Sequence, residues 1–182
     1  MPLIAGVILA GGQSSRMGVD KSQLTFKNQT LLERAHNLLI QSSIEPVFIS
    51  GPNGIQDRYN NIGPLGGILS CLTQLTEYNY ILFTPVDMPL LKKEILEKLI
   101  HKMSLDLSHL QNHRFPLILK NTAQVRKLIQ KQITDNVLSL YQLFEKTEVN
   151  TIKHRFDKAL FLNANSPKQW QDAKKRLRLL EP

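Results

Sequence analysis

Residues 3–21 read LIAGVILAGGQSSRMGVDK, a short apolar run that breaks into two glycines and then into hydroxyl and cationic side chains. The run over residues 3–10 is continuous and apolar, which predicts a buried strand. The residues that follow it, 11–21, are rich in glycine and polar side chains and are expected to form a loop. A flexible loop with positive charge, placed directly after a buried strand, indicates a binding site for an anionic ligand.

The side chains of this loop are of the types that bind phosphate. Gly11 and Gly12 let the backbone approach a ligand closely and turn successive N–H groups towards it. Ser14 adds a hydroxyl donor, Arg16 can hold phosphate oxygens with two hydrogen bonds, and Lys21 adds a mobile positive charge. We therefore expect a triphosphate or a similar group. The spacing fits neither the Walker loop nor the dinucleotide fingerprint, and by composition alone a solvated surface loop is the alternative.

The rest of the chain alternates between strand and helix patterns. Further strands are expected over residues 46–50, 80–83, 115–119 and 159–163, and residues 105–110 alternate as an exposed strand does. Helices are expected over residues 30–42, 92–103, 122–131, 137–146 and 167–180, with another that begins in the segment GPLGG at 63–67. Thr30 and Glu33 fit a capping box at the start of the first of these helices. This alternation predicts an α/β fold with a parallel sheet and helices on both faces.

Length and composition limit the class of protein. A chain of 182 residues without a linker or repeat is expected to form one domain over residues 1–182. No apolar run approaches the ~20 residues of a membrane helix, and the first residues lack the features of a secretory signal. The single cysteine, Cys71, has no partner for an internal disulfide and suits a reducing compartment. We expect a cytoplasmic protein that does not act at a membrane.

The formal net charge of +8 favours anionic partners, which include nucleic acid, acidic lipids and polyphosphate metabolites. The basic residues are not gathered in one arm, and the densest group, over residues 174–178, lies near the end of the predicted C-terminal helix. Cations at that position complement the helix dipole. Zinc-finger spacing and aromatic RNA-binding motifs are absent from the sequence. Nucleic acid is therefore not an expected partner.

One carboxylate directly follows a predicted strand. Asp87 lies within PVDMP (residues 85–89), after the apolar run at 80–83, and the flanking prolines would stiffen this turn. Magnesium is bound through oxygen, commonly by one or two carboxylates together with phosphate oxygens and water. Asp87 is therefore a candidate metal ligand. The alternative is a helix cap, which is less favoured because the next predicted helix begins several residues later.

Two amides lie near the C-terminal end, in FLNANSP (residues 161–167). Asn163 and Asn165 offer donors and acceptors without charge, which suits a polar ligand. The alternative is helix capping, since Asn165 or Ser166 could cap the helix that Pro167 begins. Capping accounts for one of these polar residues but not for both asparagines.

From Leu9 the chain carries the ordered series LAGG-x-S-x-RMG-x-DK. This series resembles the nucleotide-binding signature of the molybdenum cofactor guanylyltransferases, which belong to a larger group of nucleotidyltransferases. That resemblance implies a Rossmann-like, three-layer α/β/α fold with a mainly parallel sheet. Members of the group that use CTP tend to carry LAAG and a Pro-Lys ending, so LAGG with Asp20–Lys21 is similar to the members that use GTP.

The resemblance also implies the reaction. It is a Mg²⁺-dependent transfer of GMP from GTP to the terminal phosphate of molybdenum-bound molybdopterin, with release of pyrophosphate. Arg16, Lys21 and Asp87 are the implied catalytic residues, and Asp87 is the implied ligand of Mg²⁺. A general base is not required, because the attacking phosphate is already ionised. Implied recipients of the product are molybdoenzyme apoproteins or their chaperones.

Further site residues follow from the same resemblance. Asp57 precedes Gly63 by six residues, the interval at which the family has an aspartate that contacts the nucleotide. Ser50 takes a place where relatives have an asparagine that touches the base. The implied acceptor-binding residues are Arg114, Asn163 and Asn165. The implied nucleotide-binding residues are Leu9, Ala10, Gly11, Gly12, Ser14, Arg16, Gly18, Lys21, Ser50, Asp57, Gly63 and Asp87.

Three other functions stay open at this stage. A related nucleotidyltransferase that acts on a sugar phosphate or another phosphorylated metabolite would bind CTP or UTP in place of GTP. A non-catalytic nucleotide-binding protein would bind GTP without turnover. Nucleic-acid binding, indicated only by the net charge, would show a steep dependence on salt and ranks last.

Overall fold

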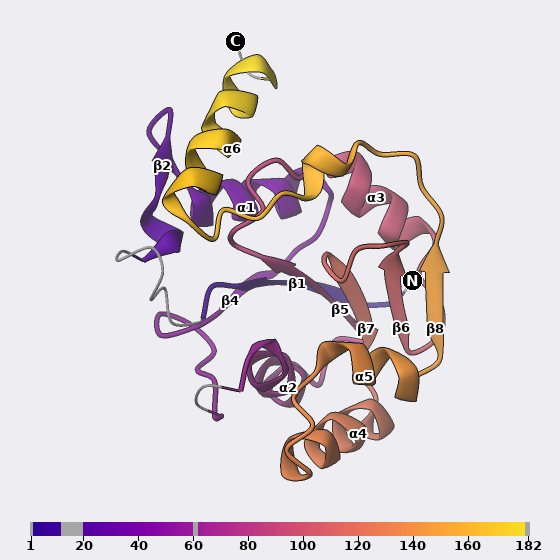
Figure 1. Ribbon diagram of the computed structural model, residues 1–182. Helices are drawn as coiled ribbons and strands as arrows, with labels where there is room; N and C mark the ends of the chain where they lie inside the picture. Colours follow the sequence, from indigo (N-terminus) through magenta and orange to yellow (C-terminus); the bar gives the residue numbers. More distant parts are fainter. Residues whose placement is uncertain (1, 12–19, 60–61, 181–182) are drawn as a thin grey trace.

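The computed structural model describes residues 2–11, 20–59 and 62–180 (Figure 1). Within this part of the chain a six-stranded sheet has the order β4-β1-β5-β7-β6-β8. All of its strands point the same way except β7, which is antiparallel to both neighbours. The bounds are Ile4–Leu9 for β1, Val47–Ser50 for β4, Tyr80–Pro85 for β5, Leu107–Leu110 for β6, Leu117–Lys120 for β7 and Val149–Ile152 for β8. The predicted mainly parallel sheet is confirmed.

Helices cover both faces of this sheet, which confirms the three-layer fold (Figure 1). One face carries α1 (Leu31–Gln41), α3 (Lys93–His101) and α6 (Pro167–Leu180), and the other carries α2 (Pro64–Gln74), α4 (Ala123–Thr134) and α5 (Leu140–Lys146). Each face buries its own apolar cluster, because successive side chains of a strand point to opposite faces. In β1, Val7 belongs to the α2 side and Ile8 to the α1 side, and neither is exposed.

Local signals place the starts of the first two helices. Helix α1 begins after Thr30, whose hydroxyl accepts the Glu33 N–H while the Glu33 carboxylate accepts the Thr30 N–H, so the predicted capping box is confirmed. Helix α2 begins after Gly63, which has a φ of 73°, and Pro64 occupies its first turn. A positive φ at this residue favours glycine, and proline at the first helical position is pre-organised for the helix.

A short excursion separates β1 from α1. It contains the 3₁₀ turn η1 (Lys21–Gln23) and a two-stranded hairpin of β2 (Thr25–Phe26) and β3 (Gln29–Thr30). The sequence pattern over residues 22–27 does not separate helix from strand. Phe26 is the buried residue of the hairpin and packs into the cluster beneath α1, so the excursion is held to the body of the protein.

The prediction of a strand over residues 159–163 is wrong. Residues Lys158–Phe161 form a 3₁₀ turn, η2, and Asp157 caps it by accepting the Ala159 N–H. Phe161 is buried and Leu160 packs against the α1-side cluster, whereas Leu162 is exposed. Periodicity alone does not distinguish an apolar run that pairs in a sheet from one that packs across it.

The outer strands of the second half were also misjudged. The sixth strand is β8, which the sequence analysis missed because Val149–Ile152 has only two apolar residues and lies at the sheet edge. Strand β6 lies where residues 105–110 were expected to form an exposed strand, but Leu107, Ser108 and Leu110 are buried. The reason is that β6 is enclosed between β7 and β8, with α3 against it.

Smaller differences concern element ends. The strand expected at 115–119 is β7 and begins two residues later, and the helix expected at 137–146 is α5, which begins after the Ser139 cap. Across the described ranges, none of the helices is both long enough and apolar enough to pass through a lipid bilayer.

Candidate functional site

The carboxyl ends of the parallel strands meet at one edge of the sheet. The chain leaves β1 for helix α1 on one face and leaves β4 for helix α2 on the other, and β1 lies between β4 and β5. In open α/β sheets, ligands bind outside the carboxyl ends of the strands at such a change of direction. The segment that joins β8 to α6, residues 153–166 (the β8–α6 segment), returns along this edge (Figure 1).

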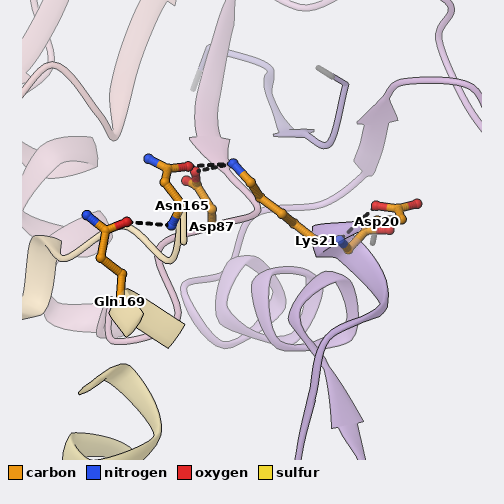
Figure 2. Close-up of polar contacts among 6 residues, drawn as sticks. Asp20, Lys21, Asp87, Asn165 and Gln169 are labelled. Atoms are coloured by element: carbon orange, nitrogen blue, oxygen red, sulfur yellow. Dashed lines mark hydrogen bonds and ion pairs between the residues drawn. The ribbon is translucent and has the colours of Figure 1, made fainter. Parts of the chain in front are cut away.

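Three of the predicted site residues meet there (Figure 2). Lys21 Nζ lies 3.6 Å from Asp87 Oδ2 and donates a hydrogen bond of 2.5 Å to Asn165 Oδ1. The backbone holds the same segments together, because the Ala164 N–H donates to the Asp87 carbonyl at 2.7 Å. A loop after β1, a loop after β5 and the β8–α6 segment therefore converge on one cation and one carboxylate.

The lysine is placed by its neighbour in the chain. The Asp20 side chain accepts the Ser22 N–H at 2.9 Å and so caps η1, of which Lys21 is the first residue. Ser22 is buried, which fixes this turn against the body of the protein. The long Lys21 side chain thus starts from a defined position and reaches inward, with 22% of it exposed.

Asp87 is partly desolvated, with 16% of its side chain exposed. Burial raises the pKa of its carboxyl group above the ordinary value, and the Lys21 ammonium opposes that rise. A desolvated carboxylate gains from a ligand that carries positive charge, in addition to the charge of the neighbouring lysine. Among residues 2–11, 20–59 and 62–180 there is no set of three His, Cys, Asp or Glu side chains that could enclose a metal ion. A metal held by Asp87 would take its other ligands from substrate and water, which fits the preferences of magnesium.

The loops that follow β1 and β4 lie against each other. The Ala10 N–H donates to the Ser50 carbonyl at 2.9 Å, and Leu9 accepts from the Val86 N–H at 3.1 Å. A Cβ on Gly51 would lie 3.3 Å from the Gly11 nitrogen, so glycine at Gly51, with a φ of 153°, permits this close approach. The predicted residues Gly12, Ser14, Arg16 and Gly18 lie outside the described residues.

Asp57 packs on the first turns of α2. A Cβ on Gly66 would lie 2.6 Å from both carboxylate oxygens of Asp57, so this carboxylate occupies the space that the glycine leaves. It accepts the Tyr59 N–H at 2.8 Å and a hydrogen bond from the Ser70 hydroxyl. Burial raises the pKa of Asp57, and these two hydrogen bonds oppose the rise. The positive end of the α2 dipole lies at this end of the helix and favours an anion there.

Ser50 is buried beside the same helix. Its hydroxyl oxygen would lie 2.7 Å from a Cβ on Gly67, and it forms a hydrogen bond with the Cys71 thiol. Gly63, by contrast, is exposed at the start of α2. The predicted Ser50 and Asp57 are thus brought together over one end of α2, on the opposite side of the sheet from Lys21 and its partners.

The remaining acceptor-binding candidates do not touch this cluster. Arg114 is exposed on the turn between β6 and β7, which lies at the same edge because β6 is parallel to β5. Stacking of His113 on Phe161, with ring centroids 3.6 Å apart, joins that turn to the β8–α6 segment. The Asn163 Oδ1 atom is buried and has no hydrogen-bond partner among the described residues.

Sequence reasoning missed one residue of the site, Gln169. Its Oε1 accepts the Asn165 N–H at 3.0 Å, while its own N–H donates to the Ser166 hydroxyl at 3.3 Å. Ser166 therefore caps α6, and Asn165 binds Lys21, so the two residues divide the roles that the sequence left open. The spacing Ser-x-x-Gln is that of a capping box and could have drawn attention to Gln169.

Comparisons with known proteins agree with the resemblance seen in the sequence. The family model described as the MobA-like NTP transferase domain matches residues 6–139. The chain is 33% identical over 172 residues to a molybdenum cofactor guanylyltransferase of Xanthomonas euvesicatoria pv. vesicatoria, with 91% of each chain covered. It is also 40% identical over 111 residues to a molybdenum cofactor guanylyltransferase of Pasteurella multocida, covering 53% of this chain and 57% of that one.

Solved structures show the same fold at low identity. The molybdopterin-guanine dinucleotide biosynthesis protein A of Archaeoglobus fulgidus has a TM-score of 0.72 at 18% identity, covering 96% of this chain and 99% of that one. The 4-diphosphocytidyl-2C-methyl-D-erythritol synthase of Anaerococcus prevotii reaches 0.75 at 12% identity, covering 97% and 99%. Because proteins with such different names share the fold, the fold does not choose the substrate. The family model and the relative matched over 91% of its length together show that this chain belongs to the MobA-like NTP transferase domain family.

Proposed function

We propose that this protein transfers GMP from GTP to molybdenum-bound molybdopterin, releases pyrophosphate and forms molybdopterin guanine dinucleotide. The observation that carries the proposal is the meeting of Lys21, Asp87 and Asn165 at the carboxyl edge of the sheet. These residues come from three separate motifs of the sequence. Their convergence provides a cation and a carboxylate at the place where an α/β sheet binds its ligand. The relative covered over 91% of its length carries the name of this activity.

Each part of the site has a role in the proposal. The backbone from Leu9 to Gly12 binds the nucleotide, together with Ser14, Gly18 and Gly63, and Asp57 and Ser50 contact it from the α2 side. Arg16 and Lys21 hold the triphosphate and stabilise the charge that develops on the leaving pyrophosphate. The attacking phosphate is already ionised, so no side chain needs to remove a proton. All 182 residues act as one domain in this scheme.

The proposed metal is Mg²⁺ at Asp87. A single half-buried carboxylate is a typical contribution of a protein to a magnesium site that is completed by substrate phosphates and water. When bound, the ion would neutralise charge on the triphosphate. The raised pKa of Asp87 supports this assignment, because a carboxylate that is costly to keep charged gains most from a cation.

Arg114, Asn163 and Asn165 are the proposed acceptor side of the site. Arg114 is exposed at the shared edge and is available to a phosphate. The buried oxygen of Asn163, for which the described residues offer no hydrogen-bond partner, would accept an N–H from the pterin. The proposed location is the cytoplasm, and the proposed recipients are molybdoenzyme apoproteins or their chaperones.

Release of pyrophosphate tests the proposal. Native protein, Asp87→Ala and Asp172→Ala are compared with GTP or CTP and Mg²⁺, with and without molybdenum-loaded molybdopterin. Asp172 is an exposed carboxylate on α6 and is the matched control. Native protein and Asp172→Ala should release pyrophosphate from GTP only when the pterin is present, and Asp87→Ala should not. Release with CTP, or with another phosphorylated acceptor in place of the pterin, would point to a different nucleotidyltransferase, and binding of GTP without release would point to a non-catalytic protein.

A further inference from the structure

The first turn of α6 is tied directly to the β8–α6 segment at the site (Figure 2). Gln169 Oε1 accepts the backbone N–H of Asn165 at 3.0 Å, and the Gln169 N–H donates to the Ser166 hydroxyl. Trp170, the next residue, is buried in the α1-side cluster, and its N–H donates to the Ser166 carbonyl at 2.9 Å. Gln169 itself is exposed, so its side chain contributes this contact with little packing of its own.

The residue that Gln169 holds is the hydrogen-bond partner of the site lysine. Lys21 Nζ donates to Asn165 Oδ1, whereas the distance from Nζ to Asp87 Oδ2 is 3.6 Å, beyond an ordinary hydrogen bond. A lysine ammonium has three donors on a flexible stem and is fixed only by the groups that accept from it. Asn165 is a neutral acceptor. It therefore fixes the position of the ammonium without neutralising its charge.

We propose that Gln169 is a positioning residue that keeps Asn165 where its amide oxygen holds the Lys21 ammonium for the polyphosphate. The consequence for catalysis rests on the proposed function. The chain of contacts from Gln169 through Asn165 to Lys21 is independent of that function. Gln169 and Asn165 both lie beyond residue 139, where the match to the family model ends. Helix α6 thus contributes to the site through the contact of Gln169 with Asn165.

The competing explanation is that Gln169 only stabilises the start of α6. In that case its loss would weaken the helix and leave the Lys21 ammonium as it is. A direct readout is the rate at which an amine-acetylating reagent modifies Lys21, measured by peptide mass spectrometry. A hydrogen bond withholds the amine from the reagent, and the measurement needs no turnover. Lys168, exposed on the same turn of α6, is the internal reference.

The variants are Gln169→Ala, Gln169→Glu, Asn165→Ala and Gln171→Ala. Gln169→Ala removes the acceptor, and we expect Lys21 to react about five-fold faster, the factor that corresponds to one hydrogen bond. Asn165→Ala should have at least that effect. Gln169→Glu keeps an acceptor oxygen and should react no faster than native protein. Gln171→Ala, an exposed glutamine two residues further along the helix, should match native protein.

The same variants in the pyrophosphate assay should show kcat lowered about five-fold in Gln169→Ala, and unchanged in Gln171→Ala and Gln169→Glu. An unchanged Lys21 rate in Gln169→Ala overturns the inference, and so does an equal rise at Lys21 and Lys168, which would indicate general loosening of α6. If native protein shows no transfer while Lys21 responds as expected, the proposed function fails and the positioning role stands.

Discussion

The effect of Gly66→Ala on the free energy of unfolding should depend on residue 57. The substitution should destabilise the protein when Asp57 is present and stabilise it when Asp57 is replaced by alanine. Gly66 lies in the first turns of α2, where alanine is ordinarily the better helix former by about 1 kcal/mol. The new Cβ would lie 2.6 Å from each carboxylate oxygen of Asp57, whereas ordinary contact begins at 3.4 Å. The carboxylate would have to withdraw by roughly 0.8 Å to restore a normal contact.

That withdrawal has a cost that can be worked out from the contacts of Asp57. Its carboxylate accepts the Tyr59 N–H at 2.8 Å and a hydrogen bond from Ser70. A hydrogen bond to a charged group contributes about 2 kcal/mol, so loss of one exceeds the helix gain. Gly66→Ala should therefore lower the free energy of unfolding by about 1 kcal/mol. Asp57→Ala protein lacks the carboxylate that the new Cβ would meet, so Gly66→Ala should there raise the free energy of unfolding by about 1 kcal/mol.

Urea unfolding of native protein, the two single variants and the double variant closes this cycle and yields a coupling of about 2 kcal/mol. The midpoint and slope of each transition are compared, so that a change in cooperativity is separated from a change in stability. If Gly66→Ala stabilises both backgrounds by the same amount, Asp57 does not occupy the space above Gly66 and the reasoning is refuted.

Three further predictions concern titratable groups. Burial raises the pKa of the Cys71 thiol to about 11, so iodoacetamide at mildly alkaline pH should modify it only through unfolding, and a rate equal to that of a free thiol would contradict this. Burial, followed by the charge of His154, lowers the pKa of His113 in the folded protein. The stability that this group contributes is therefore complete above its unfolded pKa of about 6.5 and is lost as the pH falls through the folded value. Melting temperatures measured across this range would refute the prediction if they did not decline, or if the same decline were retained in His113→Gln. Burial also raises the pKa of Asp87 against the opposing effect of Lys21. Asp87→Asn should therefore melt no lower than native protein while it loses transferase activity. A clear fall in melting temperature would contradict this, because it would show that the ion pair with Lys21 outweighs the desolvation of Asp87.

The first half of the fold could be predicted from the sequence because its signals are local. The apolar run of β1, the capping box at Thr30 and the proline after Gly63 each mark an element through its own residues. Asp87 was identified as a site residue for the same reason, since it follows a buried strand directly. These predictions agree with the structure because tertiary packing favours the same helices and strands as the local sequence.

The second half depended on partners that are distant in the sequence. Strand β8 has little apolar character and is a strand because β6 offers it an edge, whereas the more apolar residues 159–163 pack across the sheet edge instead. The role of Asn165 could not be read locally either. An asparagine before a helix suggests a cap, and only the fold brings Lys21 to its amide oxygen. Gln169 was missed because its contact depends on that arrangement.

The most direct test of the central claim is to follow the phosphates of GTP. GTP labelled at the α-phosphate or at the γ-phosphate is incubated with the protein, Mg²⁺ and molybdenum-loaded molybdopterin, and the products are separated. Nucleotidyl transfer predicts that the α-label appears in the pterin product and the γ-label in pyrophosphate. Label from the γ-phosphate on the pterin, or no label on it from either position, would contradict the account.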